Sequence, residues 1–193
     1  MLSNNSTMLE EDPEVDLIFL EGAKVFPGDR LVPLNDGYNK ANIFNMETAE
    51  VYSHLMRLNK YPGSACTKLV KRALVTNNNI YFRVELLAED IEWTLNLFSF
   101  AKTFNYCDFD YYRYRQGRKG SVTDKITKRH LDSLTTIIRE WASDSLEING
   151  PFQNFVNSSM AYEYIIVMAN SWNLVKTQRK NIRLLREMLD LPL

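Results

Sequence analysis

Basic and aromatic side chains alternate in one stretch of the chain, DFDYYRYRQGRKGSVTDKITKRH, residues 108–130. Lysine and arginine bind phosphate groups, and the flat faces of tyrosines can stack on unpaired bases. Glycines let the backbone approach a ligand, and Ser121-Val-Thr-Asp124 has the spacing of a capping box, so a helix N-terminus should open beside the cations. This combination predicts a phosphate or nucleic-acid surface over residues 111–130. Its candidate contacts are Tyr112, Arg113, Tyr114, Arg115, Arg118, Lys119, Lys128 and Arg129.

The same stretch also fits a purely structural role. If residues 109–115 are extended, Phe109, Tyr111, Arg113 and Arg115 face one way, and the intervening side chains face the other. A half-buried strand with a basic edge is a common protection against unwanted strand pairing, and tyrosines pack there with their hydroxyls in water. The net charge of −1 for the whole chain also falls short of the strongly basic balance of most nucleic-acid-binding domains.

Motifs for catalysis are missing from the sequence. It has no phosphate-binding loop, dinucleotide fingerprint, zinc-protease motif or nucleophile elbow. The two histidines, His54 and His130, lie far apart, and neither has a second ligand at helical spacing. The two cysteines, Cys66 and Cys107, lack zinc spacing. We therefore predict no metal and no cofactor, assign no catalytic residue, and favour a binding protein over an enzyme.

An acidic cluster offers the one enzymatic alternative. Glu85, Glu89, Asp90 and Glu92 gather where a strand is expected to lead into a helix. Carboxylates at such a junction can hold magnesium for phosphoryl transfer, although acids at a helix start are also expected from the helix dipole. A phosphoryl-transfer or nucleotide-processing enzyme would require Glu85 and Glu89 to line a pocket.

The composition is that of a globular protein. With 193 residues, 45% hydrophobic and 24% charged, we expect one globular domain over residues 15–193, preceded by a disordered acidic arm, residues 1–14. No apolar run approaches the roughly 20 residues of a membrane helix, and the acidic N-terminus is unlike a signal peptide. We therefore expect no membrane association and a reducing, cytoplasmic location. The sequence does not indicate an oligomeric state.

The periodicity predicts a mainly α fold of the α+β class, with five or six helices. A short N-terminal hairpin over residues 24–34 should turn at Pro27 and Gly28. Residues 80–86, IYFRVEL, alternate as a strand should and predict the one central strand. Helices are expected from about 45, from Ser64, over 88–104, over 124–146, and as a long C-terminal helix from about 159 to 190.

The leading functional hypothesis is an intracellular nucleic-acid-associated or regulatory binding protein that uses residues 111–130. The alternative is a protein–protein interaction or assembly factor without nucleic acid, of the small viral accessory type that asparagine-rich turns, abundant tyrosine and compact size suggest. The enzymatic reading above is the second alternative. The partner is accordingly a nucleic acid or another protein.

Overall fold

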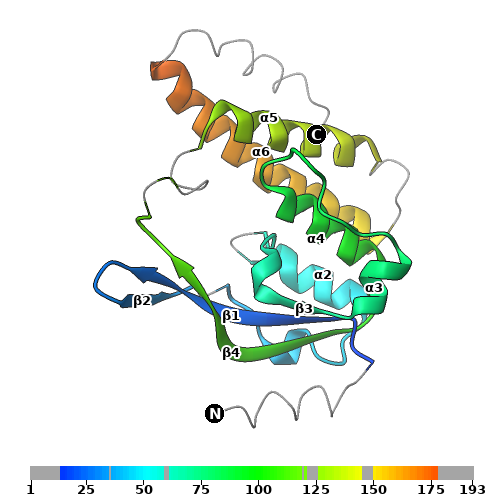
Figure 1. The fold of residues 1–193 in the computed structure, drawn as a ribbon. Coiled ribbons are helices and arrows are strands. Elements are labelled where there is room, and N and C mark those ends of the chain that lie inside the picture. The colour runs from blue at the N-terminus through cyan, green and yellow to red at the C-terminus, as the bar shows by residue number, and fades with distance from the viewer. Residues whose placement is uncertain are drawn as a thin grey trace.

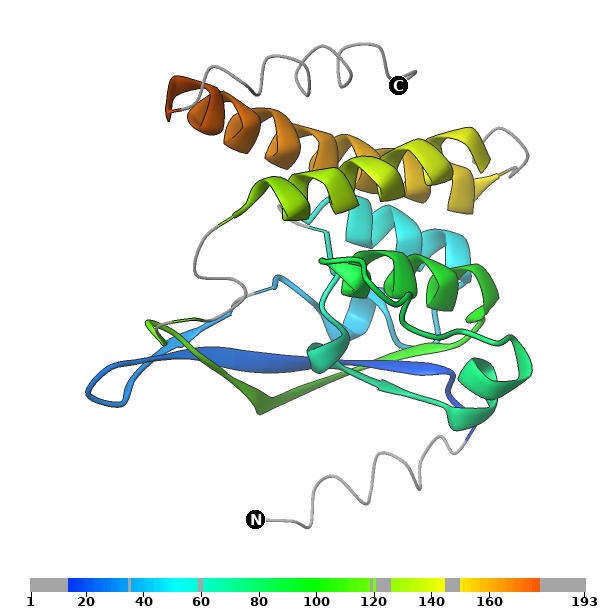
Figure 2. The same cartoon turned by 45° about the horizontal axis from the view of Figure 1, so that its top comes forward.

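The computed structural model describes residues 14–34, 36–58, 61–118, 120, 126–144 and 150–177. Its described part is built in layers (Figure 1). A sheet forms one side, two helices pack directly against one face of the sheet, and two longer helices form the layer beyond them. Figure 2 shows this stacking from a second direction.

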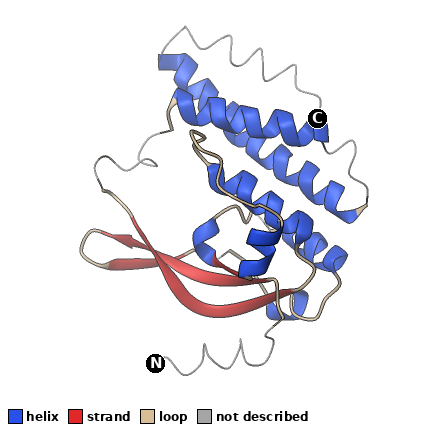
Figure 3. Cartoon of the chain, turned by 45° about the vertical axis from the view of Figure 1, so that its right-hand side comes forward, coloured by secondary structure: helices blue, strands red, loops and turns tan. Residues whose placement is uncertain are grey.

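The sheet has four strands, β1 (Leu17–Phe26), β2 (Arg30–Pro33), β3 (Lys68–Val70) and β4 (Phe104–Arg115). Antiparallel pairing joins β1 to β2 at the C-terminal end of β1 and to β3 at its N-terminal end. A parallel ladder with β4 runs along the opposite edge of β1, from Leu17 to Val25. β1 is thus the central strand of a mixed sheet, which Figure 3 shows as a curved ribbon beneath the helices.

The ladder between β1 and β4 is irregular in its middle. Leu20 pairs with Cys107, but Glu21 pairs with Asp110 and Gly22 with Tyr112, so β4 contains extra residues at this point. Such a bulge bends the strand and re-aims the side chains that follow it. The backbones of β1 and β4 approach each other closely at Gly22. A Cβ atom on this residue would lie 2.8 Å from the Tyr112 carbonyl oxygen.

Helices α2 and α4 form the inner layer, and α5 and α6 form the outer one (Figure 1). Acidic residues Glu89, Asp90 and Glu92 occupy the first turn of α4, where they favour the positive end of the helix dipole. No described helix is long and apolar enough to cross a membrane. The helical elements are η1 (Lys40–Asn42), α2 (Thr48–Met56), η2 (Ala65–Thr67), α3 (Arg72–Asn77), α4 (Glu89–Phe100), α5 (Lys128–Asp144) and α6 (Pro151–Thr177).

Aromatic rings from several elements fill the core between sheet and helices. Phe155 of α6 lies 5.2 Å from the ring of Phe98 in α4 and 5.1 Å from that of Tyr52 in α2. The Tyr52 hydroxyl donates a hydrogen bond of 2.5 Å to the Phe98 carbonyl oxygen, so its polar group is satisfied inside the core. Phe19 of β1 joins the same cluster, and burial of these rings ties the three layers together.

The expected mainly α fold with a single central strand is wrong. The chain is an α/β mixture with a four-stranded mixed sheet. Residues 80–86 form no strand, and the side chains of Tyr81 and Val84 are 65% and 85% exposed. Phe82 instead stacks on Trp93 of α4 at 4.9 Å, and Arg83 pairs with Glu92 and with a second acid on α5. Alternation predicted a strand, but the segment pairs with no described strand and is held by these side-chain contacts.

The helix expected from Ser64 is also wrong. In its place the chain forms η2, β3 and α3 in succession. Cys66 and Leu69, which a helix would have buried, are exposed, whereas Lys68 is only 7% exposed. The extended backbone at β3 reverses the faces that a helix would have given these side chains, because successive residues of a strand point to opposite sides.

Two further expectations fall largely outside the described residues. These are the acidic arm, of which only Glu14 is described, and the part of the C-terminal helix beyond residue 177. Glu14 forms an ion pair with Lys71 at 2.5 Å. The prediction of a disordered arm followed by one domain therefore stays a prediction.

Replacing Gly22 with alanine should destabilise the protein by about 1–3 kcal/mol, because the new methyl group collides with the β4 backbone. Urea unfolding of the variant measures this loss. Gly28→Asn is the matched control, since Gly28 has open space around its Cβ position and asparagine tolerates its positive φ of 78°. Equal stability of the two variants would contradict a tight approach of β4 at Gly22.

Candidate ligand-binding cleft

A cleft of ≈ 360 Å³ opens between the sheet and the segment that precedes β3. Small-ligand sites commonly measure roughly 300–1,000 Å³ and combine apolar walls with a few polar groups. The lining combines aromatic rings, two carboxylates, a lysine, a thiol and hydroxyl groups. Its residues are Lys24, Leu34, Asp36, Tyr38, Tyr61, Pro62, Gly63, Ser64, Cys66, Thr67, Asp90, Tyr112 and Tyr114.

Two tyrosines of β4 form the sheet side of this cleft. The rings of Tyr112 and Tyr114 are stacked, with centroids 6.0 Å apart and planes inclined by 16°. Both follow the bulge opposite Glu21 and Gly22, which turns them towards the cleft. Burial, and next a hydrogen bond with the Cys66 thiol, raises the pKa of Tyr112 to about 12. Tyr112 is therefore a neutral phenol near pH 7, tied across the cleft to the opposite wall.

Two carboxylates face the same space from different parts of the chain. Asp36, in the loop after β2, is 9% exposed, and Asp90 lies in the first turn of α4. Burial raises the pKa of Asp90, while a hydrogen bond from the Ala65 backbone N–H at 3.2 Å acts to lower it. The charges of Asp36 and Glu21 add to burial in raising the pKa of Tyr38. Hydrogen-bond acceptors for ligand hydroxyl groups are thus present on two sides.

The wall formed by residues 62–65 is held by side chains behind it. The Lys68 ammonium donates to the carbonyl oxygens of Pro62 and Ser64, each at 2.6 Å. The Thr94 hydroxyl donates to the Gly63 carbonyl oxygen at 2.9 Å. Together with the bond between Ala65 and Asp90, these contacts engage every residue of the wall. The wall is therefore pre-organised, which reduces the entropic cost of binding a ligand.

Lys68 is a buried cation beneath this wall. Burial lowers its pKa from 10.5 to about 7, against the charges of Asp90 and Asp36, which act to raise it. Desolvation disfavours the ammonium form, and the two carboxylates partly offset that cost. A strongly shifted pKa beside a cleft is a feature of functional sites, and here it belongs to a group that positions the wall.

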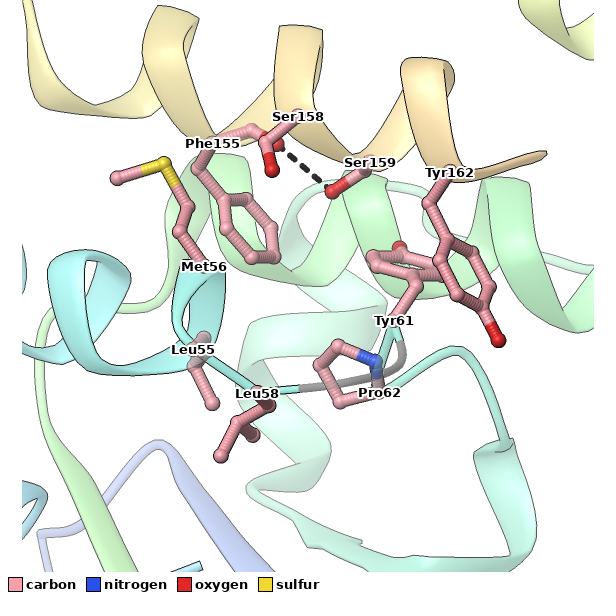
Figure 4. Close-up of a pocket in the computed structure, with 9 residues that line it drawn as sticks. All are labelled: Leu55, Met56, Leu58, Tyr61, Pro62, Phe155, Ser158, Ser159 and Tyr162. Atoms are coloured by element: carbon pink, nitrogen blue, oxygen red, sulfur yellow. Dashed lines mark hydrogen bonds between the residues drawn. The ribbon is translucent and has the colours of Figure 1, made fainter. Parts of the chain in front are cut away.

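A second, smaller hollow of ≈ 50 Å³ lies on the other side of Tyr61 and Pro62 (Figure 4). Leu55 and Met56 of α2 and Phe155 of α6 also line this hollow. The same short segment therefore separates two cavities. Nearby on α6, Glu163 is 4% exposed, and its charge acts to raise the pKa of Tyr61.

The predicted phosphate surface is divided between several places. Tyr112 and Tyr114 line the cleft, whereas Arg113 and Arg115 are exposed on β4 and do not line it. Arg113 forms an ion pair with Asp110 on its own strand. Arg118 is exposed beyond the end of β4.

The remaining predicted cations belong to the start of α5 or lie outside the described part. Lys128 pairs with Asp132 at 2.7 Å, and Arg129 donates to the Glu85 carbonyl oxygen at 3.1 Å. Both are engaged within the protein. Lys119 and the predicted capping box, residues 121–124, are outside the described residues.

Sequence reasoning missed Asp36, Tyr38 and Cys66 as cleft residues, and it missed Lys68 as the residue that supports the cleft wall. The helix expected from Ser64 does not form, and the extended backbone of β3 buries Lys68. Of the acidic cluster at residues 85–92, the residue in the cleft is Asp90, and neither Glu85 nor Glu89 lines it. Within the described residues, no three or more histidine, cysteine or acidic side chains gather so as to hold a metal ion.

Neither a protein-family model nor a curated protein matches this chain. Among solved structures, the chain is similar to the crystal structure of S. aureus TarS 1-349 in complex with UDP-GlcNAc, with a TM-score of 0.65 and 19% identity. The likeness covers 99% of this chain and 53% of TarS 1-349, so the chain spans about half the length of that structure. At this identity the likeness shows a shared fold.

The likeness contradicts part of the sequence-based interpretation. The solved protein with this fold is in complex with a nucleotide sugar, and those cations of the predicted surface that the structure describes do not line the cleft with the tyrosines. The interpretation as a nucleic-acid-binding, regulatory or viral accessory protein is therefore wrong.

Replacing Lys68 with methionine should destabilise the protein by about 2–3 kcal/mol, because the Pro62 and Ser64 carbonyl oxygens lose a charged donor. Urea unfolding measures the loss. Lys102→Met, at an exposed lysine, is the control and should be nearly neutral. An equally stable Lys68→Met variant would show that the wall does not need this cation.

Glu163 should make stability depend on pH. Burial raises its pKa from 4.5 to about 7, so the folded protein binds this proton more tightly than the unfolded chain. The contribution of Glu163 to the free energy of unfolding is fully present below pH 4.5 and is lost as pH rises through 7. The loss amounts to up to about 3 kcal/mol. Glu163→Gln should remove this part of the pH dependence of Tm, and Glu89→Gln should retain it. Identical pH profiles for wild type and Glu163→Gln would contradict the assignment.

Proposed function

We propose that the cleft between β4 and residues 61–67 binds a nucleotide sugar, as part of a glycosyltransferase-like enzyme. The observation that carries this proposal is the lining of the cleft: a stacked pair of tyrosines opposite a rigid wall, with carboxylates at two sides. The shared fold with TarS 1-349, which was crystallised in complex with UDP-GlcNAc, supports this ligand class over others.

The chemistry of the lining suits the parts of such a ligand. The ring faces of Tyr112 and Tyr114 can stack on a base or pack against a sugar ring. The carboxylates of Asp36 and Asp90 accept hydrogen bonds from ribose or sugar hydroxyl groups. Lys24, which pairs with Tyr114 across the ladder, supplies a cation for a diphosphate.

Charge balance in the cleft also favours this class over a nucleic-acid strand. Asp36 and Asp90 place negative charge in the walls, and a phosphate backbone running through the cleft would meet that charge repeatedly. A nucleotide sugar brings its phosphates together at one point, and its many hydroxyl groups can use the carboxylates. The ligand therefore needs one cationic contact, and Lys24 provides it.

Tyr114→Ala should weaken binding of UDP-GlcNAc by roughly five- to a hundredfold, because stacking on an aromatic ring contributes about 1–3 kcal/mol. Isothermal titration calorimetry of the full chain measures the dissociation constant. Tyr111→Ala is the matched control, since Tyr111 is on the same strand, is 59% exposed and does not line the cleft.

Further titrations assign the two ends of the ligand. If Tyr114→Ala weakens the binding of UDP as much as it weakens the binding of UDP-GlcNAc, the base of the ligand lies on the tyrosines. A wild-type chain that binds neither compound, or a Tyr114→Ala variant that binds as tightly as Tyr111→Ala, would refute the proposal.

A further inference from the structure

Tyr38 brings to the cleft a hydroxyl group that the protein itself does not use. Its side chain lines the cleft and is only 8% exposed. Tyrosine hydroxyl groups inside a protein usually have a partner: those of Tyr52 and Tyr61 donate to backbone carbonyl oxygens, and that of Tyr106 donates to a carboxylate. The Tyr38 hydroxyl group has no hydrogen-bond partner among the described residues. A ligand can supply the missing partner.

This hydroxyl group is open to the cleft. The Tyr38 oxygen is not among the described side-chain atoms that are closed to water and lack a partner, so water reaches it. Burial, and next the charges of Asp36 and Glu21, raises the pKa of Tyr38. These charges act over short distances, so the Tyr38 oxygen lies near both carboxylates, and Asp36 lines the cleft with it. A ligand in the cleft can therefore reach this oxygen.

The ring that carries the hydroxyl group is held in place. Phe19 of β1 and Tyr106 of β4 pack around it, with ring centroids 4.8 Å and 6.0 Å from that of Tyr38. The raised pKa keeps the phenol neutral near pH 7. Tyr38 therefore presents a fixed hydroxyl group that both donates and accepts, and little side-chain entropy is lost when a ligand binds.

The surroundings of Tyr38 decide which part of a nucleotide sugar it can contact. A diphosphate beside it would meet the negative charges of Asp36 and Glu21, and it would gain more beside Lys24. The base can lie on the stacked tyrosine pair of β4, and the ribose stays beside the base. The sugar beyond the diphosphate is neutral, and its hydroxyl groups both donate and accept, so it suits a neutral phenol next to carboxylates.

We propose that Tyr38 binds the sugar beyond the diphosphate, and that its hydroxyl group recognises a hydroxyl group of this sugar. The inference rests on the proposed function of the cleft. It deepens that function by assigning the tyrosine pair of β4 to the base and Tyr38 to the sugar. Tyr38 is accordingly a specificity residue, which separates a nucleotide sugar from the nucleotide without its sugar.

Tyr38→Phe tests this assignment, because phenylalanine keeps the ring and removes only the hydroxyl group. Isothermal titration calorimetry of the full chain should show UDP-GlcNAc binding weakened by roughly two- to tenfold, the value of one hydrogen bond, and UDP binding unchanged. Tyr106→Phe is the matched control, since this ring packs beside Tyr38, its hydroxyl group already donates to Glu21 and it does not line the cleft. This control should bind both compounds as tightly as the wild type.

Urea unfolding separates recognition from folding. The midpoint of Tyr38→Phe should stay close to that of the wild type, because the lost hydroxyl group has no hydrogen-bond partner among the described residues. A markedly lower midpoint would show a structural role and overturn the inference. UDP binding that Tyr38→Phe weakens as much as UDP-GlcNAc binding would also overturn it, since the contact would then be to the nucleotide.

Failure of this inference can be told apart from failure of the proposed function. A wild-type chain that binds neither compound refutes the proposed function and this inference with it. A wild-type chain whose UDP-GlcNAc binding is weakened by Tyr114→Ala but not by Tyr38→Phe refutes this inference alone.

Discussion

The structure depends on β1 being paired along both of its edges. β4 occupies one edge over nearly the whole strand, and β2 and β3 divide the other edge between them. Leu17 and Phe19 are buried against the helices, and Ile18 and Leu20 are buried on the opposite face of β1, so this strand lies inside the protein on both faces. The extra residues of β4 must then be taken up in the bulge. That bulge brings Tyr112 and Tyr114 to the cleft.

The cleft wall shows a second constraint, which is the cost of burying charge. Lys68 loses most of its hydration beneath the wall, and this loss outweighs the attraction of Asp90 and Asp36 in setting its pKa. The lysine is nevertheless useful there, because one ammonium group reaches two carbonyl oxygens of a turn that has no regular secondary structure. A threonine at position 68 would have a single hydroxyl donor and would reach fewer of these carbonyl oxygens. The charges of Asp90 and Asp36 offset part of the cost of keeping this ammonium group buried.

Local pattern was sufficient for some elements and misleading for others. The helix expected over residues 124–146 corresponds to α5, and the acids at residues 89–92 marked the start of α4. Residues 80–86 alternate as a strand should, yet they form no strand, because strand formation also depends on a partner strand elsewhere in the chain, and side-chain contacts with α4 and α5 hold this segment. The short β3 could not be found from pattern alone, since its three residues are held by pairing with β1.

The residues of the candidate site were likewise predicted from the sequence only in part. Tyr112 and Tyr114 were selected for their ring faces, and they do line a cleft, although their role in binding stays a prediction. The cations beside them in the sequence were grouped by proximity along the chain. The strand then separated them, because alternate residues of β4 face opposite sides. Lys68 and Asp36 come from segments that only the tertiary fold brings to β4, and no local signal marks them.

The contacts within the wall also restrict how a ligand can be recognised. The carbonyl oxygens of Pro62, Gly63 and Ser64 already accept hydrogen bonds from the protein, and the Ala65 N–H already donates to Asp90. A ligand that used these backbone groups would compete with the bonds that keep the wall in place. In the proposed nucleotide-sugar site, recognition is accordingly assigned to side chains that face the cleft, including Tyr112, Tyr114, Asp36, Asp90 and Lys24. Specificity at this site is accordingly open to change by single substitutions that leave the wall, and with it the fold, intact.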